Sequence, residues 1–270
     1  MPEGHTVHRS ANDFNRLFAG QQITVNSPQG RFDLGASLVT ETTFVKANAI
    51  GKQLFLKFAQ DKTVRIHLGI FGKWKFKELD ADLYGADVPP VVGEVRARFM
   101  APNAVVDLRG PTVCEVLSET EVAQVLKRLG PDPINPDPNG IEGERFVVKV
   151  LASKTSIGQL LMNQAVVSGI GNVYRAEILF RAGIDPYTPG NLLSRSQVAN
   201  LWADSVKLLK VGVKTGFMIT RDELATKRPT KAERNFVYKR EGKPCRVCGH
   251  DISIAIMATR KLYWCGACQS

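Results

Sequence analysis

The sequence has no long apolar run. None approaches the roughly 18 to 20 consecutive apolar residues that cross a bilayer. Residues 1–5 show neither the basic start nor the apolar stretch of a signal peptide. Glycine and proline, 23 and 14 of 270 residues, are too few for a collagen-like or low-complexity chain. We therefore expect a soluble, intracellular, globular protein without a membrane partner, and its length predicts about two domains.

Cysteine is scarce and unevenly distributed. Of five cysteines, four lie in the last 26 residues as Cys245-x2-Cys248-x16-Cys265-x2-Cys268, and Cys114 stands alone in an apolar context. Two CxxC pairs at this separation predict one structural Zn2+ site, because each short loop presents two thiolates to the same ion. Two disulfides or a redox pair would need an oxidising compartment or a thioredoxin-like context, and neither is indicated. Cys114 is expected to be a buried apolar side chain rather than a nucleophile.

Acidic residues are outnumbered, and the imbalance is confined to one half. The chain has 36 Lys and Arg against 26 Asp and Glu, a net charge of +10. Residues 1–140 carry 16 of each sign, whereas residues 141–270 carry 20 basic and 10 acidic ones. Nine of these basic residues lie between Arg221 and Arg246. This asymmetry indicates a large polyanionic partner, with nucleic acid the first candidate. A merely soluble basic face is the alternative.

The first half is typical of short strands after one helix. β-rich segments between Gly, Pro or Asp breaks predict strands over 21–25, 41–49, 53–58, 63–67, 73–77, 94–100 and 103–108. Val7, Ala11, Phe14 and Phe18 recur at spacings of four and three, which predicts a helix over residues 6–18. Such strands form a sandwich or a barrel, and we expect an N-terminal β-sandwich domain with a leading helix over residues 1–128.

The second half is typical of helices. Four prolines between Gly130 and Gly140 exclude helix and central strand, so residues 129–143 are expected to form a linker. Helical spacing follows over 144–152, 156–164, 172–182 and 195–211, and a basic loop over 221–243 leads to the cysteines. The predicted fold class is α+β, with a helical domain over 144–235 and a zinc finger over 236–270.

A glycine-rich turn, Gly-Ile-Gly-Asn at 169–172, separates two of these helices. Its glycines allow close backbone approach, and the free N–H groups of the next helix suit a phosphate, although a turn without a ligand would look the same. In the context of residues 160–177, the turn closely resembles the helix-two-turns-helix signature of the formamidopyrimidine-DNA glycosylase and endonuclease VIII family. The resemblance covers essentially the whole chain, through Pro2-Glu3-Gly4, Gly51-Lys52 and the four cysteines with Arg260.

The resemblance implies a bifunctional DNA glycosylase and abasic-site lyase that binds damaged double-stranded DNA. Pro2-Glu3-Gly4 and an aromatic residue at 71 are similar to the endonuclease VIII branch, which implies oxidised pyrimidines as substrates. Removal of Met1 would leave Pro2 with a secondary amine, and an α-amino group with a pKa of about 8 is partly neutral at about pH 7. Attack of this amine on C1′ of the deoxyribose expels the base and leaves an iminium, which promotes cleavage by β,δ-elimination. A monomer in the cytoplasm, associated with the nucleoid, is expected.

The resemblance also implies the other catalytic residues. Glu3 would donate a proton to the opening sugar, and Lys52 would assist base loss and β-elimination. Arg260 would bind the phosphates flanking the lesion and assist δ-elimination. Without the resemblance, Glu3 would be a surface carboxylate and Lys52 a solvated lysine at a strand edge.

Several residues are expected to contact DNA. Flipping a base out of the duplex leaves a void that an apolar or planar side chain must fill. Gly69-Ile70-Phe71 matches the family's void-filling position, with a core-facing turn as the alternative. Arg128 and Asn172 match positions that contact DNA phosphates in the family, Gly171 belongs to the same turn as Asn172, and Lys154 is a further candidate.

The chain departs from the family pattern at two places. Thr6 stands where the family has a second carboxylate, so His5 or His8 would have to supply any proton relay, although packing explains a histidine on a helix face equally well. Gly158 stands where a lysine is common, which removes one expected phosphate contact. Three other functions fit the residues: an oxidised-purine glycosylase, an abasic lyase with weak base excision, and a non-catalytic, structure-specific DNA-binding protein.

Overall fold

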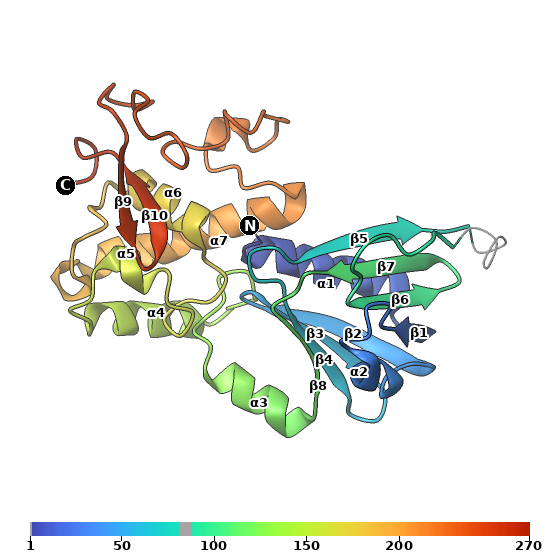
Figure 1. The fold of residues 1–270 in the computed structure, drawn as a ribbon. Helices are drawn as coiled ribbons and strands as arrows, with labels where there is room; N and C mark the ends of the chain where they lie inside the picture. Colours follow the sequence, from blue (N-terminus) through green and yellow to red (C-terminus); the bar gives the residue numbers. More distant parts are fainter. Residues whose placement is uncertain (1, 81–87) are drawn as a thin grey trace. The chain divides into compact units, whose positions relative to one another are not determined.

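The computed structural model describes residues 2–80 and 88–270, which form two compact units (Figure 1). Pro2 and residues 6–128 make up the first unit, and Glu3–His5 with Leu129–Ser270 make up the second. Three residues close to the N-terminus thus pack with the C-terminal half of the chain. No helix within the described ranges combines the length and the apolar character that a membrane span requires.

The first unit contains an eight-stranded antiparallel sheet in the order β5-β7-β6-β1-β2-β3-β4-β8. Its strands are β1 (Gln22–Asn26), β2 (Thr42–Ile50), β3 (Gln53–Phe58), β4 (Thr63–His67), β5 (Lys73–Glu78), β6 (Ala97–Ala101), β7 (Ala104–Arg109) and β8 (Val113–Leu117). β1 pairs with β2 through Gln22 and Ile23 and with β6 through residues 24–26, so it joins the two halves of the sheet. Figure 1 shows β5, β6 and β7 grouped apart from β2, β3, β4 and β8. Side chains from both halves enter one core, as predicted for a sandwich.

Helix α1 (Gly4–Phe18) contributes the centre of this core. Its side chains Val7, Phe14 and Phe18 are buried, as their spacing predicted. The Phe14 ring lies 5.0 to 6.1 Å, between ring centroids, from five other aromatic rings, those of Phe18, Phe44, Trp74, Phe76 and Phe99. Such tilted and edge-on contacts add to the burial of apolar area. The helix therefore anchors strands from both halves of the sheet.

Three elements of the first unit carry no signal that we identified in the sequence: β8, α2 (Asp33–Ser37) and α3 (Glu119–Lys127). β8 has four half-buried residues in a row, so the alternation of buried and exposed positions is missing. α3 buries none of its residues and begins with a capping box, in which Ser118 and Glu121 satisfy each other's backbone N–H groups. Elements without a buried face show little apolar periodicity.

The second unit consists of helices followed by a C-terminal β-hairpin. Its elements are α4 (Ile141–Leu151), α5 (Ile157–Leu160), α6 (Asn172–Ala182), α7 (Arg195–Thr215), the 3-10 helices η2 (Gly190–Leu192) and η3 (Asp222–Leu224), and the strands β9 (Ser253–Met257) and β10 (Arg260–Trp264). Tyr174 and Ile178 of α6 pack in a core with α4 and α7. Phe180 of α6 packs in a second core with Tyr263 of β10. α6 therefore connects the helices to the hairpin.

Several helix boundaries differ from the sequence prediction, among them the end of α7, at Thr215 instead of 211. α5 ends at Leu160 instead of 164, because the side chain of Gln164 bonds to the backbone of Gly169 and Ile170, and such bonds compete with a helix. Residues 129–140 are all described, and none of them is in a helix or strand, as their prolines predicted. α4 then begins at Ile141, inside the range expected to be linker.

The proline-rich segment is packed within the second unit. Pro131 and Pro133 are buried, and the Pro131 carbonyl accepts a hydrogen bond from the Ser168 N–H at 2.8 Å. The Gly130 N–H donates to the carbonyl of Gln164, also at 2.8 Å. These contacts hold the segment against the residues that precede the glycine turn.

Candidate active site and zinc centre

The Glu3 carboxylate is buried against the start of α6. Its side chain is 0% exposed and accepts hydrogen bonds from the N–H groups of Gly171 (2.8 Å), Val173 (2.8 Å) and Tyr174 (3.4 Å). The first N–H groups of a helix lack partners within the helix and carry the positive end of its dipole, so they stabilise a carboxylate. The sequence suggested that these N–H groups are free for a phosphate. In the structure they bind the chain's own Glu3 instead.

Two glycines allow the N-terminal residues to lie close to this turn. A Cβ at Gly171 would lie 2.5 Å from Cδ of Glu3, and a Cβ at Gly4 would lie 2.9 Å from the Cα of Gly169. The Gly4 N–H donates to the Gly169 carbonyl at 2.8 Å. The glycines of the turn therefore allow the N-terminal segment to approach the helix. Pro2, which precedes Glu3, is half-buried, and Met1 lies outside the described residues.

Arg260 is the first residue of β10, next to the tight turn of the hairpin. It pairs with Met257 of β9, and the residues between them, Ala258 and Thr259, have positive φ angles of 50° and 59°. Two successive left-handed residues are typical of a hairpin turn that matches the twist of its strands. The half-buried Arg260 guanidinium donates to the Thr259 carbonyl. Among the described residues this is the one hydrogen bond of the guanidinium, so most of its donors remain available to a ligand.

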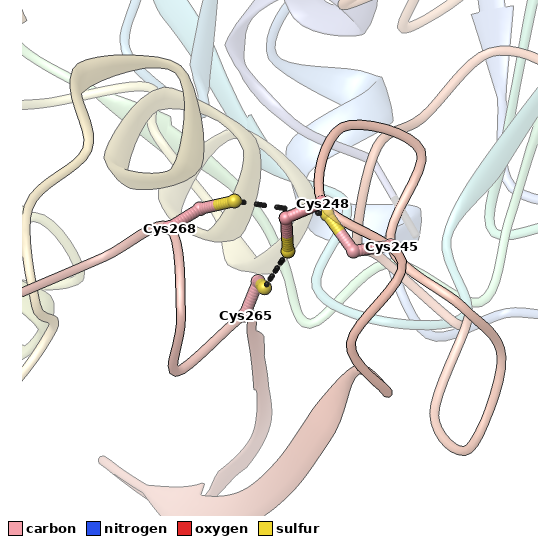
Figure 2. A group of neighbouring side chains, drawn as sticks. All are labelled: Cys245, Cys248, Cys265 and Cys268. Atoms are coloured by element: carbon pink, nitrogen blue, oxygen red, sulfur yellow. Dashed lines mark hydrogen bonds between the residues drawn. The ribbon is translucent and has the colours of Figure 1, made fainter.

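The four C-terminal cysteines converge on one point (Figure 2). Their Sγ atoms all lie within 4.8 Å of one another, with Cys245 3.9 Å from Cys268 and Cys248 3.4 Å from Cys265. A tetrahedral ion with bonds of about 2.3 Å requires sulfurs about 3.8 Å apart. The set therefore fits one zinc ion. Four thiolates leave no open coordination position, so the zinc is structural.

A hollow of about 460 Å³ in the second unit is strongly basic. Its lining includes six basic side chains, those of Lys231, Arg234, Lys239, Arg240, Lys243 and Arg246. None of the six is ion-paired with a carboxylate in the part of the chain that the structure describes, and burial and the charge of Arg246 lower the pKa of Arg240. Val173, whose N–H donates to Glu3, also lines the hollow. A hollow with charges of one sign attracts a polyanion.

Lys52 lies at one end of the sheet in the first unit. Gly51 and Lys52 form the turn between β2 and β3, and Lys52 is half-buried. His67, which the sequence analysis did not single out, ends β4 and pairs with Gln53, the residue after Lys52. Burial first, and then the charges of Lys52 and Arg65, lower the pKa of His67. The imidazole beside Lys52 is therefore held in its neutral form.

The turn after β4 carries two exposed apolar side chains. Phe71 is 83% exposed and Ile70 is 47% exposed, which excludes the alternative that Phe71 faces the core. Gly69 has a φ of +63°, and a Cβ there would lie 1.9 Å from Oγ1 of Thr112. Large exposed apolar side chains on a constrained turn are typical of a contact with a partner.

Comparison with known proteins identifies the family. Models of the formamidopyrimidine-DNA glycosylase N-terminal domain and H2TH domain match residues 1–112 and 129–223, and a model of the zinc finger found in FPG and IleRS matches residues 242–270. Endonuclease 8 1 of Mycobacterium tuberculosis is 42% identical over 275 residues, which cover 100% of both chains. The chain belongs to the formamidopyrimidine-DNA glycosylase and endonuclease VIII family. The family is one of DNA glycosylases that act in DNA repair, as the motifs indicated.

Other members of this glycosylase family are also similar to the chain in sequence or in fold. A formamidopyrimidine-DNA glycosylase of Xanthomonas campestris is 35% identical over 284 residues, with 100% of both chains covered. The Lactococcus lactis formamidopyrimidine-DNA glycosylase matches with a TM-score of 0.80 in complex with DNA that contains N7-benzyl-Fapy-dG, at 24% identity and over 99% of each chain. Its structure bound non-covalently to DNA with an abasic site gives 0.79, at 22% identity and over 99% of each chain. These structures share the fold of this glycosylase.

The other predicted DNA contacts of the glycosylase differ in exposure. Arg128 and Lys154 are exposed. Asn172 is buried instead, and its amide is engaged inside the protein. Its Nδ2 donates to the Lys261 carbonyl at 2.8 Å, and its Oδ1 accepts from Arg175 at 2.5 Å. The expected phosphate ligand at Asn172 is therefore a link between α6 and β10 in this structure.

Packing constrains the residues at the two places where the sequence departs from the family pattern. His5 is buried, and its ring meets the Tyr174 ring edge-on with centroids 5.5 Å apart. His8 is also buried, and Thr6 is half-buried. A Cβ at Gly158 would lie 2.9 Å from the Pro186 carbonyl oxygen, so the lysine common in the family does not fit there without movement.

The sequence analysis missed two charged residues of α6 that are fully buried, Arg175 and Glu177. The Glu177 carboxylate accepts hydrogen bonds from four donors, the N–H groups of Phe236, Val237 and Tyr238 and the hydroxyl of Thr220. Burial raises the pKa of Glu177, while these donors oppose the rise. The sequence could have indicated these two residues only through their charge, because they lie on a helix whose other residues are mostly apolar. Cys114 is half-buried instead of buried as expected, and desolvation raises the pKa of its thiol to about 12, which disfavours the reactive thiolate.

Proposed function

We propose that the protein is a bifunctional DNA glycosylase and abasic-site lyase that removes oxidised pyrimidines from damaged double-stranded DNA. The observation that carries this proposal is the buried carboxylate of Glu3, the residue directly after Pro2. Three N–H groups at the start of α6 bind this carboxylate. A proton donor must be fixed relative to the reacting atoms, and a surface carboxylate would not be bound in this way. The family to which the chain belongs supports the same reading of these two residues.

The proposed reaction begins at Pro2 once Met1 has been removed. The neutral secondary amine attacks C1′ of the damaged nucleotide, the glycosidic bond breaks, and the base leaves with the bonding electron pair and takes a proton from water. Glu3 receives the proton that the amine loses and donates it to the sugar oxygen as the ring opens. The resulting iminium makes the C2′ proton acidic, so its removal expels the 3′ phosphate in β-elimination. A second elimination releases the 5′ phosphate.

Lys52 and Arg260 have further roles in the proposed reaction. Lys52 assists base loss and the first elimination, and Arg260 binds the phosphates beside the lesion and assists the second. The fork of an arginine suits a phosphate, because it offers two parallel N–H donors. The tight turn before Arg260 and its available donors support this role.

Damaged DNA is the proposed partner of both units. The basic hollow next to Val173 supports phosphate binding, and the exposed Phe71 and Ile70 support filling of the void left by the flipped base. In this proposal Gly69, Gly171 and Asn172 act indirectly: Gly69 forms the turn that exposes Ile70 and Phe71, Gly171 accommodates Glu3, and Asn172 links α6 to β10. The exposed Arg128 and Lys154 are further phosphate contacts in this proposal. We also propose that the protein acts as a monomer in the cytoplasm, at the nucleoid.

Borohydride trapping tests the proposed chemistry. The wild-type protein is expected to become covalently linked through Pro2 to DNA with an abasic site, because borohydride reduces the iminium to a stable amine. Glu3→Gln is expected to lower base excision by about 10²- to 10⁴-fold, as removal of a general acid does. It should affect trapping at a preformed abasic site far less, because the sugar of an abasic site already opens to its aldehyde in solution and needs no proton from Glu3. Intact mass and peptide mapping locate the adduct.

Glu119→Gln is the control, because Glu119 is exposed and pairs with Lys57 at the surface of the first unit. Absence of an adduct would contradict the proposal and favour a non-catalytic DNA-binding protein. Full activity of protein that still carries Met1 would instead contradict the role of Pro2 as the nucleophile.

The second candidate function is an oxidised-purine glycosylase. The relative named formamidopyrimidine-DNA glycosylase, 35% identical over the whole chain, favours it. Rates of excision from duplexes with thymine glycol and with 8-oxoguanine separate the two functions. Faster excision of thymine glycol supports the proposed pyrimidine preference, and faster excision of 8-oxoguanine overturns it. Slow excision of both with rapid abasic-site cleavage would indicate an abasic lyase.

A further inference from the structure

Arg175 is a fully buried cation with uncharged partners. Its side chain is 0% exposed, and its guanidinium donates to the carbonyls of Met257 (3.1 Å) and Lys261 (3.2 Å) and to Oδ1 of Asn172 (2.5 Å). The Nε of Arg175 is buried without a hydrogen-bond partner among the described residues. A buried charge without a carboxylate partner is costly, so its presence calls for a role that an apolar side chain cannot fill.

The two carbonyls lie on either side of Arg260. Met257 is the residue that pairs with Arg260 across the hairpin, and Lys261 is the residue that follows it. Between them stands the turn of Ala258 and Thr259, both with positive φ. Arg175 therefore holds both strands of the hairpin at the base of the turn that presents Arg260.

The same turn of helix also binds Glu3. The N–H groups of Gly171, Val173 and Tyr174 hold the Glu3 carboxylate, and Arg175 and Asn172 hold the hairpin. Residues 171–175 thus fix two groups that come from opposite ends of the chain. All these contacts lie within the second unit.

We propose that Arg175 is a positioning residue for Arg260. It fixes the position of Arg260 relative to the start of α6, and therefore relative to Glu3. The inference rests on the proposed function, since it gives Arg175 a role in the elimination chemistry. Arginine suits the task because its planar fork reaches several carbonyls at once, whereas lysine has a single ammonium. Burial lowers the pKa of Arg175 to about 10, with the Glu3 carboxylate opposing the change, so the cation persists at neutral pH.

A double-mutant cycle tests the coupling of Arg175 to Arg260. We expect Arg175→Met to slow the second elimination on abasic-site DNA by about 10- to 100-fold, the effect of a misplaced catalytic group. Arg175→Lys should restore part of the rate. In an Arg260→Ala background, Arg175→Met should have little further effect, because the group that it positions is already missing. Additive effects in the double variant would overturn the proposal.

A second measurement is independent of activity. Hydrogen exchange of residues 257–262 should accelerate in Arg175→Met, while the zinc content stays at one ion per chain. Arg181→Met is the matched control, because Arg181 lies on the same helix but pairs with Asp204 of α7. Unchanged exchange in Arg175→Met would overturn the proposal. If the wild-type protein does not cleave abasic-site DNA, the proposed function is contradicted instead. The exchange experiment would still measure whether Arg175 holds the hairpin against α6.

Discussion

At the scale of single residues, Gly171 matters because the Glu3 side chain occupies the place of its missing Cβ. Gly171→Ala would put a Cβ 2.5 Å from Cδ of Glu3, and the flexible Glu3 side chain can move away. We therefore expect a folded protein whose base excision falls as far as in Glu3→Gln, measured by single-turnover kinetics. Gly140→Ala is the control for a general loss of stability, since its φ of +67° strains an alanine while nothing lies within 4 Å of the added Cβ. Wild-type excision by Gly171→Ala would show that the position of Glu3 is unimportant.

At the scale of elements, Glu177 ties α6 to the segment that leads into the zinc finger. Glu177→Ala would leave three buried or half-buried backbone N–H groups without their acceptor, whereas the Thr220 hydroxyl keeps the Arg234 carbonyl, 3.0 Å away. Each buried donor left unsatisfied costs about 1 to 3 kcal/mol, so we expect the free energy of unfolding to fall by at least about 3 kcal/mol. Urea denaturation measures the change. Glu119→Gln should cost less than about 1 kcal/mol, because it breaks an exposed pair. A similarly small loss in Glu177→Ala would contradict this account.

At the scale of the whole molecule, the described residues form separate cores. The core of the first unit contains α1 and the sheet, whereas Cys245 and Cys265 pack with Val237 and Tyr263 in a small core of the second. Removal of zinc by a chelator should therefore abolish abasic-site cleavage and increase hydrogen exchange over residues 236–264, because metal binding stabilises so small a core. Exchange in β2, β3 and β4 should stay unchanged. Equal acceleration in the sheet would indicate that the two units unfold together.

Features with local causes were predictable from the sequence. The zinc site follows from two short CxxC loops, each of which brings its own pair of thiolates together. The strands around Leu54 and Ile66 and the helix around Phe14 follow from apolar patterns within a few residues. β8 and α3 were missed because neither has the buried face from which such a pattern arises.

The sequence by itself determined the order of the domains, the zinc ligands and the family, since these depend on residue types at short, regular spacings. Only the tertiary structure decided what the charged residues of α6 and Glu3 bind. Glu3 and Gly171 are separated by 168 positions, and Arg175 and Met257 by 82. The same structure placed Asn172 against the Lys261 carbonyl and occupied the N–H groups of the glycine turn. Contacts of this kind depend on which buried polar groups meet when distant segments pack, and no local pattern records that meeting.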